Sequence, residues 1–458
     1  MNLHTSHYTI AVKLQDEENK HLLVHGYTGA IDIVDSSIVD AMNAEDVTTT
    51  LSSEEISLLS QRGYLTEKTI EEEQEYVVYL ANLLHRKQSK LHKYFGFIIT
   101  YDCNFRCPYC FENIISKNGK SWTKQTMTKE MVDRAYDAML EIEPHRELHG
   151  KEILLYGGEP LLRENREIVE YIIRKGADFG FKFKAITNGY DLDYYTDLIT
   201  PKFFTCIQIS IDGFRDNHNK NKFHYIEGES FDKVIQNIGI VIQQNVKVNV
   251  RINFNKNNIT DKDIIYKYFI EIGYTSNEYF SIYNAKIDNF EYSPIIKDTS
   301  LFTTSEIIKN IKGNNICFAN TPVNRIIREF NEYFTKKKPW KICSASCSAQ
   351  YGTHLFDPYG KIYPCLEIVG RNKHCIGHYN NGLEWSTNKH KWFNTHVGNI
   401  PTCMKCKYAL LCGGICHAKQ LNHLEKNKTT CSLYNIAFSD AINHSFSEFN
   451  KLINKNSL

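Results

Sequence analysis

The chain has 14 cysteines, and two groups of them keep a regular spacing. The first group, Cys103, Cys107 and Cys110, forms a C-x3-C-x2-C loop after an apolar run. The second reads C-x12-G-x4-C, a gap, C-x2-C-x5-C-x3-C, a gap and C; its members are Cys347, Cys365, Cys403, Cys406, Cys412, Cys416 and Cys431. Three thiolates on one loop can hold a [4Fe–4S] cluster and leave one iron without a protein ligand. The spacing therefore predicts iron–sulfur chemistry.

Zinc is the alternative metal for both groups. Taken alone, the first triplet is compatible with a zinc knuckle and the later group with a pair of zinc ribbons. Three motifs after the triplet decide between the metals, because each lies at the end of a predicted strand. They read Gly157-Gly158-Glu159-Pro160, Thr187-Asn188-Gly189 and Ser210-Ile211-Asp212-Gly213. This context favours a cluster that binds a small cofactor.

In this order the motifs resemble those of the radical S-adenosylmethionine (SAM) enzymes, over about residues 95–290. The resemblance implies that Cys103, Cys107 and Cys110 hold a [4Fe–4S] cluster whose open iron chelates SAM. It also implies a set of cofactor-binding residues: Tyr109, Gly157, Gly158, Glu159, Asn188, Ser210, Asp212 and Arg251. The expected product of SAM cleavage is a 5′-deoxyadenosyl radical that abstracts hydrogen from a C–H bond.

The later cysteines resemble the SPASM domain, over about residues 340–435, which in relatives holds two auxiliary [4Fe–4S] clusters. Carried over, Cys347, Cys365 and Cys416 bind the first auxiliary cluster. The second is then bound by Cys403, Cys406, Cys412 and Cys431. Two saturated clusters need an eighth thiolate, for which Cys343 is our first choice. Cys317, Cys375 or an open iron remain alternatives, because connectivity cannot be deduced from sequence.

Strands that alternate with amphipathic helices must position the first cysteine group, and this alternation is typical of a parallel α/β fold. We predict a partial (β/α)6 TIM-like barrel over residues 91–300. A small N-terminal α+β domain precedes it (1–90), and a cysteine-rich SPASM domain follows (301–458). The predicted strands are Tyr94–Thr100, Glu152–Tyr156, Lys182–Thr187, Thr205–Ile211, Val246–Phe254 and Phe280–Ala285, and a hairpin is predicted at Tyr351–Cys365.

The composition argues against several other classes of protein. Lys and Arg total 54 against 53 acidic residues, so the net charge of +1 gives no reason to expect nucleic acid or an anionic membrane as partner. No apolar run has the length of a membrane span, and Lys13 interrupts the only early apolar segment. Many cysteines without a signal peptide favour a reducing compartment, and we predict the cytoplasm.

Proteins with this combination of domains mostly modify peptides or proteins, so we predict a maturase of a ribosomally synthesised precursor peptide. A thioether cross-link is the first choice of product, and carbon–carbon or carbon–oxygen cross-links remain open. Enzymes that act on small molecules share these domains and remain a competing subclass. Flavodoxin or ferredoxin is the expected electron donor. Residues 21–65 loosely resemble a leader-peptide recognition element, which binds its leader as an added strand. A simple cap on the barrel is the alternative reading of this segment.

Two alternative functions remain. One is an anaerobic sulfatase-maturating enzyme, although Leu366 and Glu367 follow Cys365 where an aspartate is expected. The other is a non-catalytic iron–sulfur electron carrier, which would not need the cofactor motifs. No general base can be named, because His218 is expected to lie on a surface loop. Cys206 is expected to be a buried small hydrophobic residue.

Overall fold

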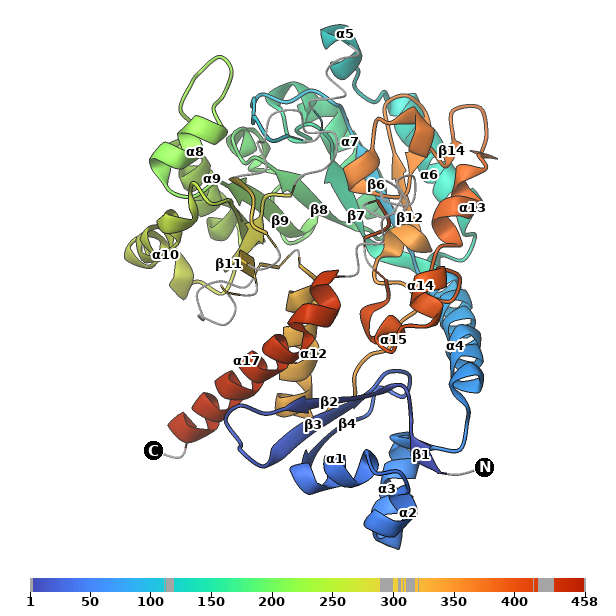
Figure 1. Ribbon diagram of the computed structural model, residues 1–458. Coiled ribbons are helices and arrows are strands. Elements are labelled where there is room, and N and C mark those ends of the chain that lie inside the picture. Colours follow the sequence, from blue (N-terminus) through green and yellow to red (C-terminus); the bar gives the residue numbers. More distant parts are fainter. Residues whose placement is uncertain are drawn as a thin grey trace. The chain divides into compact units, whose positions relative to one another are not determined.

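The computed structural model describes residues 3–110, 112, 119–288, 300–303, 306–307, 309, 318–319, 321–414, 416–418 and 432–456 (Figure 1). Contacts within the chain group the residues into two compact units. The first unit comprises residues 1–89, 303–351 and 394–458, and the second comprises 90–302 and 352–393. The cysteine-rich segment after residue 301 is therefore divided between the two units.

Six parallel strands form the centre of the second unit, and they pair in chain order. All six were predicted from the sequence, with boundaries within three residues of those observed. They are β6 (Lys93–Ile98), β7 (His149–Tyr156), β8 (Lys182–Thr187), β9 (Phe204–Ile211), β10 (Lys247–Phe254) and β11 (Phe280–Lys286). Parallel strands place their carboxyl ends at one edge of the sheet, so the motifs that follow these strands converge there.

Helices connect the strands, as a parallel sheet requires. The longer ones are α6 (Lys129–Ile142), α7 (Arg166–Asp178), α9 (Phe231–Gln243) and α10 (Lys262–Glu271). Helix α9 buries Val234, Ile238 and Val241 completely, at the spacing expected for the core-facing side of a helix. The radical-type barrel predicted from the sequence is thus confirmed as an α/β fold.

A hairpin from the cysteine-rich segment extends this sheet. Strands β12 (Thr353–Phe356) and β13 (Lys361–Tyr363) form the hairpin predicted at Tyr351–Cys365. The Gly360 amide donates to the Asp357 carbonyl oxygen at 3.1 Å, and Gly360 has a φ of 72°. Strand β12 also pairs in parallel with β6, and β14 (Gly377–His378) and β15 (Glu384–Trp385) continue the sheet to ten strands. The sequence did not indicate this pairing with the barrel.

The first unit begins with a three-stranded antiparallel sheet in the order β2 (Thr9–Lys13), β3 (Lys20–His25), β4 (Ile31–Asp35). Helices α1 (Ser36–Met42), α2 (Val47–Thr50) and α3 (Ser53–Arg62) follow, and the short strands β1 (His4–Thr5) and β5 (Leu65–Thr66) pair with each other. The capping box between Ser52 and Glu55 fixes the start of α3.

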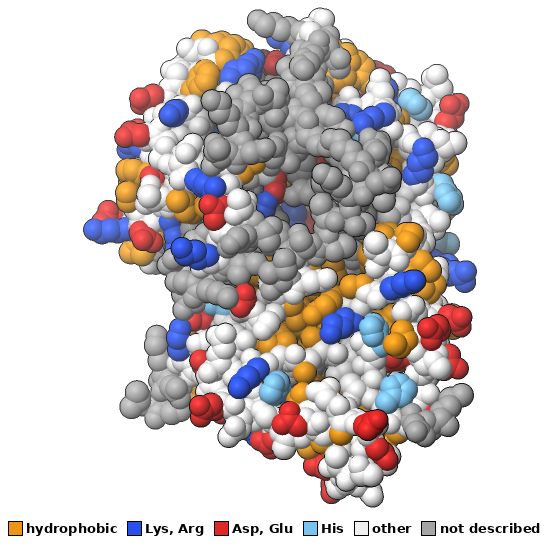
Figure 2. Space-filling model, in the orientation of Figure 1, with side chains coloured by type: hydrophobic (Ala, Val, Ile, Leu, Met, Phe, Trp, Pro, Cys, Tyr) orange, Lys and Arg blue, Asp and Glu red, His pale blue; other side chains and the backbone are white. Residues whose placement is uncertain are grey.

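Longer helices complete the first unit. Helix α4 (Ile70–Leu91) follows the N-terminal sheet, and α12 (Pro322–Lys336) packs along α17 (Ser432–Asn456) (Figure 1). The short helices α14 (Pro401–Met404) and α15 (Ala409–Cys412) carry cysteines. Among the described residues, no helix combines the length and apolarity that a bilayer crossing needs. Acidic and basic side chains are interspersed on the face drawn in Figure 2, in keeping with the near-zero net charge.

Candidate functional site

The cysteine triplet lies on the loop that follows β6. The Cys110 amide donates to the Cys107 carbonyl oxygen at 3.2 Å, which closes a tight turn between these two residues. The Cys103 amide donates to Asp102 Oδ1 at 2.9 Å, and the Phe105 amide donates to Cys103 Sγ at 3.4 Å. These bonds hold the backbone of the loop and the sulfur of Cys103 in place.

Two side chains from other loops approach these sulfur atoms. Asn188 Nδ2 lies 3.9 Å from Cys103 Sγ, and Lys222 Nζ lies 4.0 Å from Cys107 Sγ. Burial raises the pKa of the Cys103 thiol well above its ordinary value, and it also raises the pKa of Cys107 and Cys110. Cluster binding requires thiolates, which burial disfavours. The positively charged iron ions of a cluster would stabilise the negative charge of these buried sulfur atoms.

The GGEP motif packs directly on the cysteine loop. The Gly158 amide donates to the Thr100 carbonyl oxygen at 3.0 Å, and the Glu159 amide donates to that of Asp102 at 2.7 Å. A Cβ on Gly158 would overlap the carbonyl oxygen of Asp102, and one on Gly157 would overlap that of Thr100. Glycine is needed at both positions because two backbones meet there.

Glu159 connects the GGEP motif to the TNG motif. Its carboxylate is 2% exposed and accepts hydrogen bonds from the Asn188 amide at 2.6 Å, Thr187 Oγ1 at 2.6 Å and the Leu161 amide at 2.9 Å. Burial raises the pKa of Glu159 to about 7, whereas these hydrogen bonds favour the carboxylate. The side chain is thus held firmly by protein donors and fixes the loop of Asn188.

The end of β9 carries a second polar group. Asp212 is fully buried, and its Oδ1 accepts from Asn253 Nδ2 at 3.2 Å. Arg251 Nε donates to Asn253 Oδ1 at 2.9 Å, and Arg251 pairs in register with Ser210 on β9. Burial and the Asp212 carboxylate raise the pKa of Tyr109 well above its usual value. Of the predicted cofactor-binding residues, Ser210, Asp212 and Arg251 therefore lie together at the ends of β9 and β10, and Tyr109 of the cysteine loop is close to Asp212.

The surface position predicted for His218 is wrong. His218 lies on α8 (Arg215–Asn221) and is fully buried, because its ring fills the space behind the Asp212 loop. Its Nδ1 accepts from the Asp212 amide at 3.3 Å, and its Nε2 lies 3.1 Å from Ser230 Oγ. Burial lowers its pKa well below the ordinary value, so the ring is neutral. These contacts give His218 a supporting role.

Lys222 is the residue at this site that the sequence reasoning missed. Its side chain is buried, and although burial opposes the charge, the nearby Cys107 and Asp212 raise its pKa. It is thus a buried cation between a thiol and a carboxylate. No motif marks it, because it follows a short polar helix whose spacing resembles that of any surface segment.

A second cysteine group lies in the first unit, on α14, α15 and the turn between them. The Cys406 amide donates to the Cys403 carbonyl oxygen at 3.0 Å, and the Cys412 amide donates to that of Tyr408 at 2.8 Å. Burial raises the pKa of Cys412; Arg325 opposes this effect, and Cys403, Cys343 and Cys406 add to it. Four thiols therefore lie within electrostatic reach of one another.

Cys343 lies beside the turn that carries Cys412. Its amide donates to the Leu410 carbonyl oxygen at 2.9 Å, and Arg325 Nη2 donates to Cys343 Sγ at 2.9 Å. Arg325 Nη1 also donates to the Cys412 carbonyl oxygen at 2.8 Å. Cys343, predicted as the eighth thiolate, is therefore tied through Leu410 and Arg325 to the turn that carries Cys412.

The remaining cysteines differ in their surroundings. Cys347 and Cys416 are exposed in the first unit, whereas Cys365 follows β13 in the second. Cys431 and the alternative ligand Cys317 lie outside the described residues. Cys375, the other alternative, is buried and donates its thiol to the Gly377 carbonyl oxygen at 3.1 Å. Cys206 is 8% exposed, which confirms that it is a buried small residue.

The donor set at each site fits an iron–sulfur cluster. The first site offers three thiols on one loop, and at the second Cys412 lies within electrostatic reach of three further thiols. N–H groups lie near sulfur atoms at both sites, and thiolates are the usual protein ligands of such clusters. The second site in addition leaves the buried hydroxyl of Tyr8 without a hydrogen-bond partner. Among the described residues, no three His, Cys, Asp or Glu side chains converge on a position suited to one metal ion.

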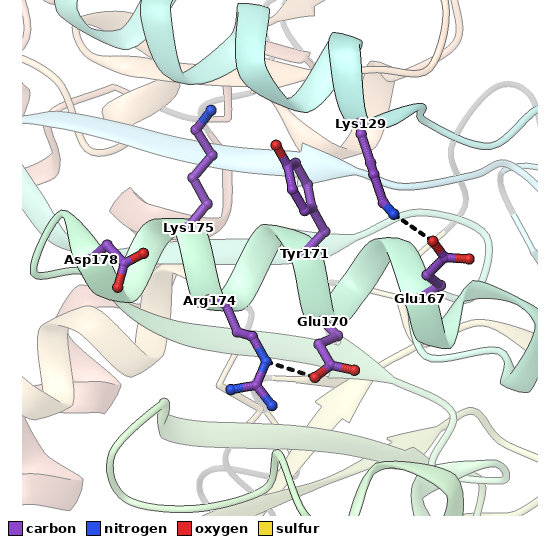
Figure 3. A pocket seen from close by; sticks show the side chains of 7 residues that line it. All are labelled: Lys129, Glu167, Glu170, Tyr171, Arg174, Lys175 and Asp178. Atoms are coloured by element: carbon purple, nitrogen blue, oxygen red, sulfur yellow. Dashed lines mark hydrogen bonds and ion pairs between the residues drawn. The ribbon is translucent and has the colours of Figure 1, made fainter.

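The described residues of the second unit line hollows, of which a pair bear on the site. One, of about 440 Å³, lies over α6 and α7, where Lys129 points to Glu167 and Arg174 to Glu170 (Figure 3). Exposed pairs of this kind neutralise each other, so we assign no site there. The other, of about 210 Å³, is lined by Cys103 together with Asp102, Arg163 and Tyr225, among others. It gives access to the cysteine loop.

Comparison with known proteins supports this assignment of the second unit. Residues 97–265 match the model of the Radical SAM superfamily. The chain is 24% identical over 355 residues to a cysteine-type anaerobic sulfatase-maturating enzyme of Clostridium perfringens, over 71% of this chain and 90% of that enzyme. A protein of Methanocaldococcus jannaschii is 28% identical over 173 residues, and a GTP 3′,8-cyclase of Psychromonas ingrahamii is 29% identical over 164 residues. The chain spans only 59% and 43% of the length of these last two.

Solved structures share the fold. Native anSMEcpe with bound AdoMet and the Cp18Cys peptide superposes with a TM-score of 0.56 at 18% identity, over 80% of this chain and 99% of that one. Streptococcus suis SuiB bound to the precursor peptide SuiA gives a TM-score of 0.51 at 12% identity, over 92% of this chain and 97% of that one. The cysteine loop, the glycine motifs that pack on it and the family match together identify residues 97–265 as a radical SAM domain, the kind that binds a [4Fe–4S] cluster and SAM.

Proposed function

We propose that this protein is a radical SAM enzyme that modifies a peptide or protein, using a SAM-binding cluster in the second unit and two auxiliary clusters. One observation carries the proposal: the GGEP backbone and the TNG loop are both fastened to the three-cysteine loop, through Glu159 and Asn188. A plain electron carrier needs the cysteines, but it has no use for such a frame beside them.

Each residue of this frame has a proposed task. Cys103, Cys107 and Cys110 would hold the cluster, which on reduction supplies the electron that splits bound SAM into methionine and a 5′-deoxyadenosyl radical. Gly157 and Gly158 keep the strand end free of side chains. Glu159 and Asn188 hold the loop beside Cys103. The group around Asp212, namely Tyr109, Ser210 and Arg251, would orient the nucleoside and carboxylate parts of SAM.

The substrate class is proposed from the relatives. One similar protein matures sulfatases, and another was solved with its precursor peptide, so both support a peptide or protein as substrate. We favour a ribosomally synthesised precursor peptide that receives a cross-link, with a thioether as the first choice. The SuiB match extends over more of this chain, whereas the anSMEcpe match has the higher TM-score and identity, so the experiments below must decide between the two substrates.

An exposed edge of the N-terminal sheet supports a proposal for where such a peptide binds. Strand β4 is at the edge of the sheet, and its Ile33 is 41% exposed. The start of β4 is covered by Arg62 of α3, whose Nη2 donates to the Ile31 carbonyl oxygen at 3.1 Å. The open part of the edge therefore begins at Ile33. We propose that a leader peptide adds there as a fourth strand, held by backbone hydrogen bonds.

The first experiment tests SAM cleavage without any substrate. Protein purified and reconstituted without oxygen is incubated with SAM and dithionite, and 5′-deoxyadenosine is measured by liquid chromatography and mass spectrometry. We expect the nucleoside to form in the wild type. Protein that contains iron on all its cysteine groups and forms none would contradict the proposal.

The second experiment tests the substrate. The protein is co-expressed with a cysteine-containing peptide encoded beside its gene, and with a sulfatase-derived cysteine peptide. A loss of two hydrogens from the former supports the cross-linking maturase. Conversion of the cysteine thiol of the latter to an aldehyde supports the sulfatase-maturating alternative, which the Clostridium perfringens relative specifically favours.

A third measurement tests the leader surface. Ile33→Lys should weaken binding of the unmodified precursor in fluorescence anisotropy, because a charged side chain on the edge opposes strand addition. Ile70→Lys is the control, since Ile70 at the start of α4 is 46% exposed and lies outside this sheet. Equal binding by both variants would place the leader elsewhere.

The electron donor is also a proposal. Flavodoxin or ferredoxin would deliver the electron from outside, and the 210 Å³ cavity lined by Cys103 is the described approach to the cysteine loop. Reduction by either donor, followed at the cluster absorbance, would test this step.

A further inference from the structure

Segments that flank strands β2 and β3 share one hydrophobic core with two cysteines of the second set. Tyr8 directly precedes β2 and Tyr27 follows β3; Val77 and Ala81 come from α4 and Cys403 from α14, with Cys406 packed against them. Residues far apart in the sequence thus enclose these cysteines. Tyr8 and Tyr27 thus form part of the wall of the proposed second auxiliary site, apart from the separate core that Leu23, Ala30 and Tyr64 form beneath the sheet.

The backbone approach at Gly26 shows how closely the two parts meet. A Cβ on Gly26 would overlap the carbonyl oxygen of Lys407, the residue directly after Cys406. The same Cβ would lie 3.1 Å from Cδ1 of Tyr8, and the Gly26 amide donates to the Tyr8 carbonyl oxygen at 2.9 Å. The Tyr8 ring therefore lies against the turn that carries Cys406.

The hydroxyl group of Tyr8 is unusual in this core. Tyr8 is 1% exposed, and its oxygen has no hydrogen-bond partner among the described residues. Neighbouring hydroxyls are satisfied: Tyr27 donates to Glu73 Oε1 at 3.1 Å, and Ser6 donates to the same oxygen at 2.5 Å. A buried hydroxyl without a partner is costly, so an unmatched one points to a missing acceptor.

We infer that Tyr8 donates its hydroxyl hydrogen to a sulfur of the second auxiliary cluster, either Cys406 Sγ or a sulfide beside it. A phenol keeps its proton at neutral pH and can act as the donor. Hydrogen bonds to cluster sulfur stabilise the reduced form and raise the reduction potential. Tyr8 is thus a positioning residue through which the N-terminal sheet tunes a cluster. The inference rests on the proposed function, because that function assigns Cys403, Cys406 and Cys412 to a cluster.

Tyr8→Phe removes only the hydroxyl oxygen and keeps the ring in the core. In the reconstituted holoenzyme we expect the midpoint potential of one cluster to fall, measured by redox titration followed with electron paramagnetic resonance. Tyr27→Phe is the matched control, since its ring lies in the same core and its hydroxyl is bound to Glu73. It should leave all midpoint potentials unchanged. Unchanged potentials in Tyr8→Phe at full iron content would overturn the inference.

A measurement on the wild type avoids any dependence on how the variant folds. Electron–nuclear double resonance of the reduced clusters, compared in H2O and D2O, should detect an exchangeable proton coupled to the second auxiliary cluster. Absence of such a proton would also overturn the inference. Metal analysis separates the two possible failures. Zinc on the second cysteine set would remove the cluster assignment itself, whereas iron there with no coupled proton removes only the role of Tyr8.

Discussion

The two cysteine environments are built by different means. In the second unit the triplet lies on a loop at the strand ends, and backbone hydrogen bonds, two close-packed glycines and polar side chains position it. In the first unit the cysteines lie on short helices within an apolar core that includes Tyr8 and Val77. Local spacing specifies the first environment almost completely. The second depends on segments hundreds of residues away, and this difference explains which features sequence reasoning could find.

The largest expected effect is the loss of SAM cleavage when one cysteine of the triplet is removed and the cysteines of the first unit are left intact. Cys107→Ala should abolish 5′-deoxyadenosine formation, because the remaining two thiols cannot hold the SAM-binding cluster. The iron on the cysteines of the first unit should remain, since that site shares no residue with the triplet. Mössbauer spectra and nucleoside assays check both points. Loss of all iron would show that the two sites are not independent.

Gly158→Ala tests the packed backbone of the second unit. The new Cβ would overlap the Asp102 carbonyl oxygen, so we expect a loss of about 1–3 kcal/mol in the free energy of unfolding and a strong loss of SAM cleavage. Urea denaturation and the nucleoside assay provide the two readouts.

Gly180→Ala serves as the control for Gly158→Ala. Gly180 has a φ of 83° and no heavy atom within 4 Å of the added Cβ, so this variant carries backbone strain alone. It should retain SAM cleavage. Equal loss of cleavage in both variants would argue against the specific role of the packed glycine.

Lys222→Met tests how a buried positive charge contributes to the triplet site. It removes the buried cation 4.0 Å from Cys107 Sγ, which should lower the potential of the SAM-binding cluster and slow cleavage by about 10–100-fold. Lys220→Met, on the helix that ends just before Lys222 and exposed, should behave as the wild type. A redox titration and single-turnover rates measure both effects. An unchanged potential in Lys222→Met would leave the lysine with a purely structural role.

Asp357 concerns the hairpin that joins the barrel sheet, and its substitution should change only the pH dependence of stability. Its carboxyl accepts from Tyr101 at 2.8 Å and from the Lys361 amide at 2.8 Å, and burial raises its pKa from 3.8 to about 6. The folded state thus binds this proton more tightly than the unfolded state. Its contribution to stability is full below about pH 4 and is lost as the pH rises through 6.

Asp357→Asn should remove this pH dependence, worth roughly 2–3 kcal/mol between these limits. The amide can keep the backbone hydrogen bonds through its oxygen, and the Tyr101 hydroxyl can turn to accept from its nitrogen. Urea midpoints measured from pH 4 to pH 7.5 check the difference between variant and wild type. A variant as dependent on pH as the wild type would assign the effect to another group.

The sequence predicted the barrel well because its signals are local. Alternating apolar strands and helices placed all six strands, and the motifs at their ends lie where parallel topology requires. The pairing of β12 with β6 was missed, because it joins residues more than 250 positions apart. Neither hydrophobic periodicity nor a turn motif in the sequence indicates such a pairing. Lys222 and the buried His218 were missed for a related reason: burial of a polar side chain follows from what packs over it.

The position of Tyr8 beside Cys406 could not be predicted from the sequence either. Nothing near it in the sequence resembles a ligand motif, and only the fold brings its ring to Cys406. The cofactor contacts assigned to Ser210 and Arg251, and the ligand sets of the two auxiliary clusters, remain predictions. Their spacing indicates them, and metal analysis of single cysteine variants would test the ligand sets directly.

The close approach of Gly26 to the carbonyl oxygen of Lys407 has a practical consequence for anyone who shortens this protein. Deleting the first 66 residues to map precursor recognition would also strip the wall from a buried thiol site and admit water and oxygen. An inactive truncated enzyme would then report damage to its metal content as readily as a lost docking surface, so iron must be counted before such a result is interpreted.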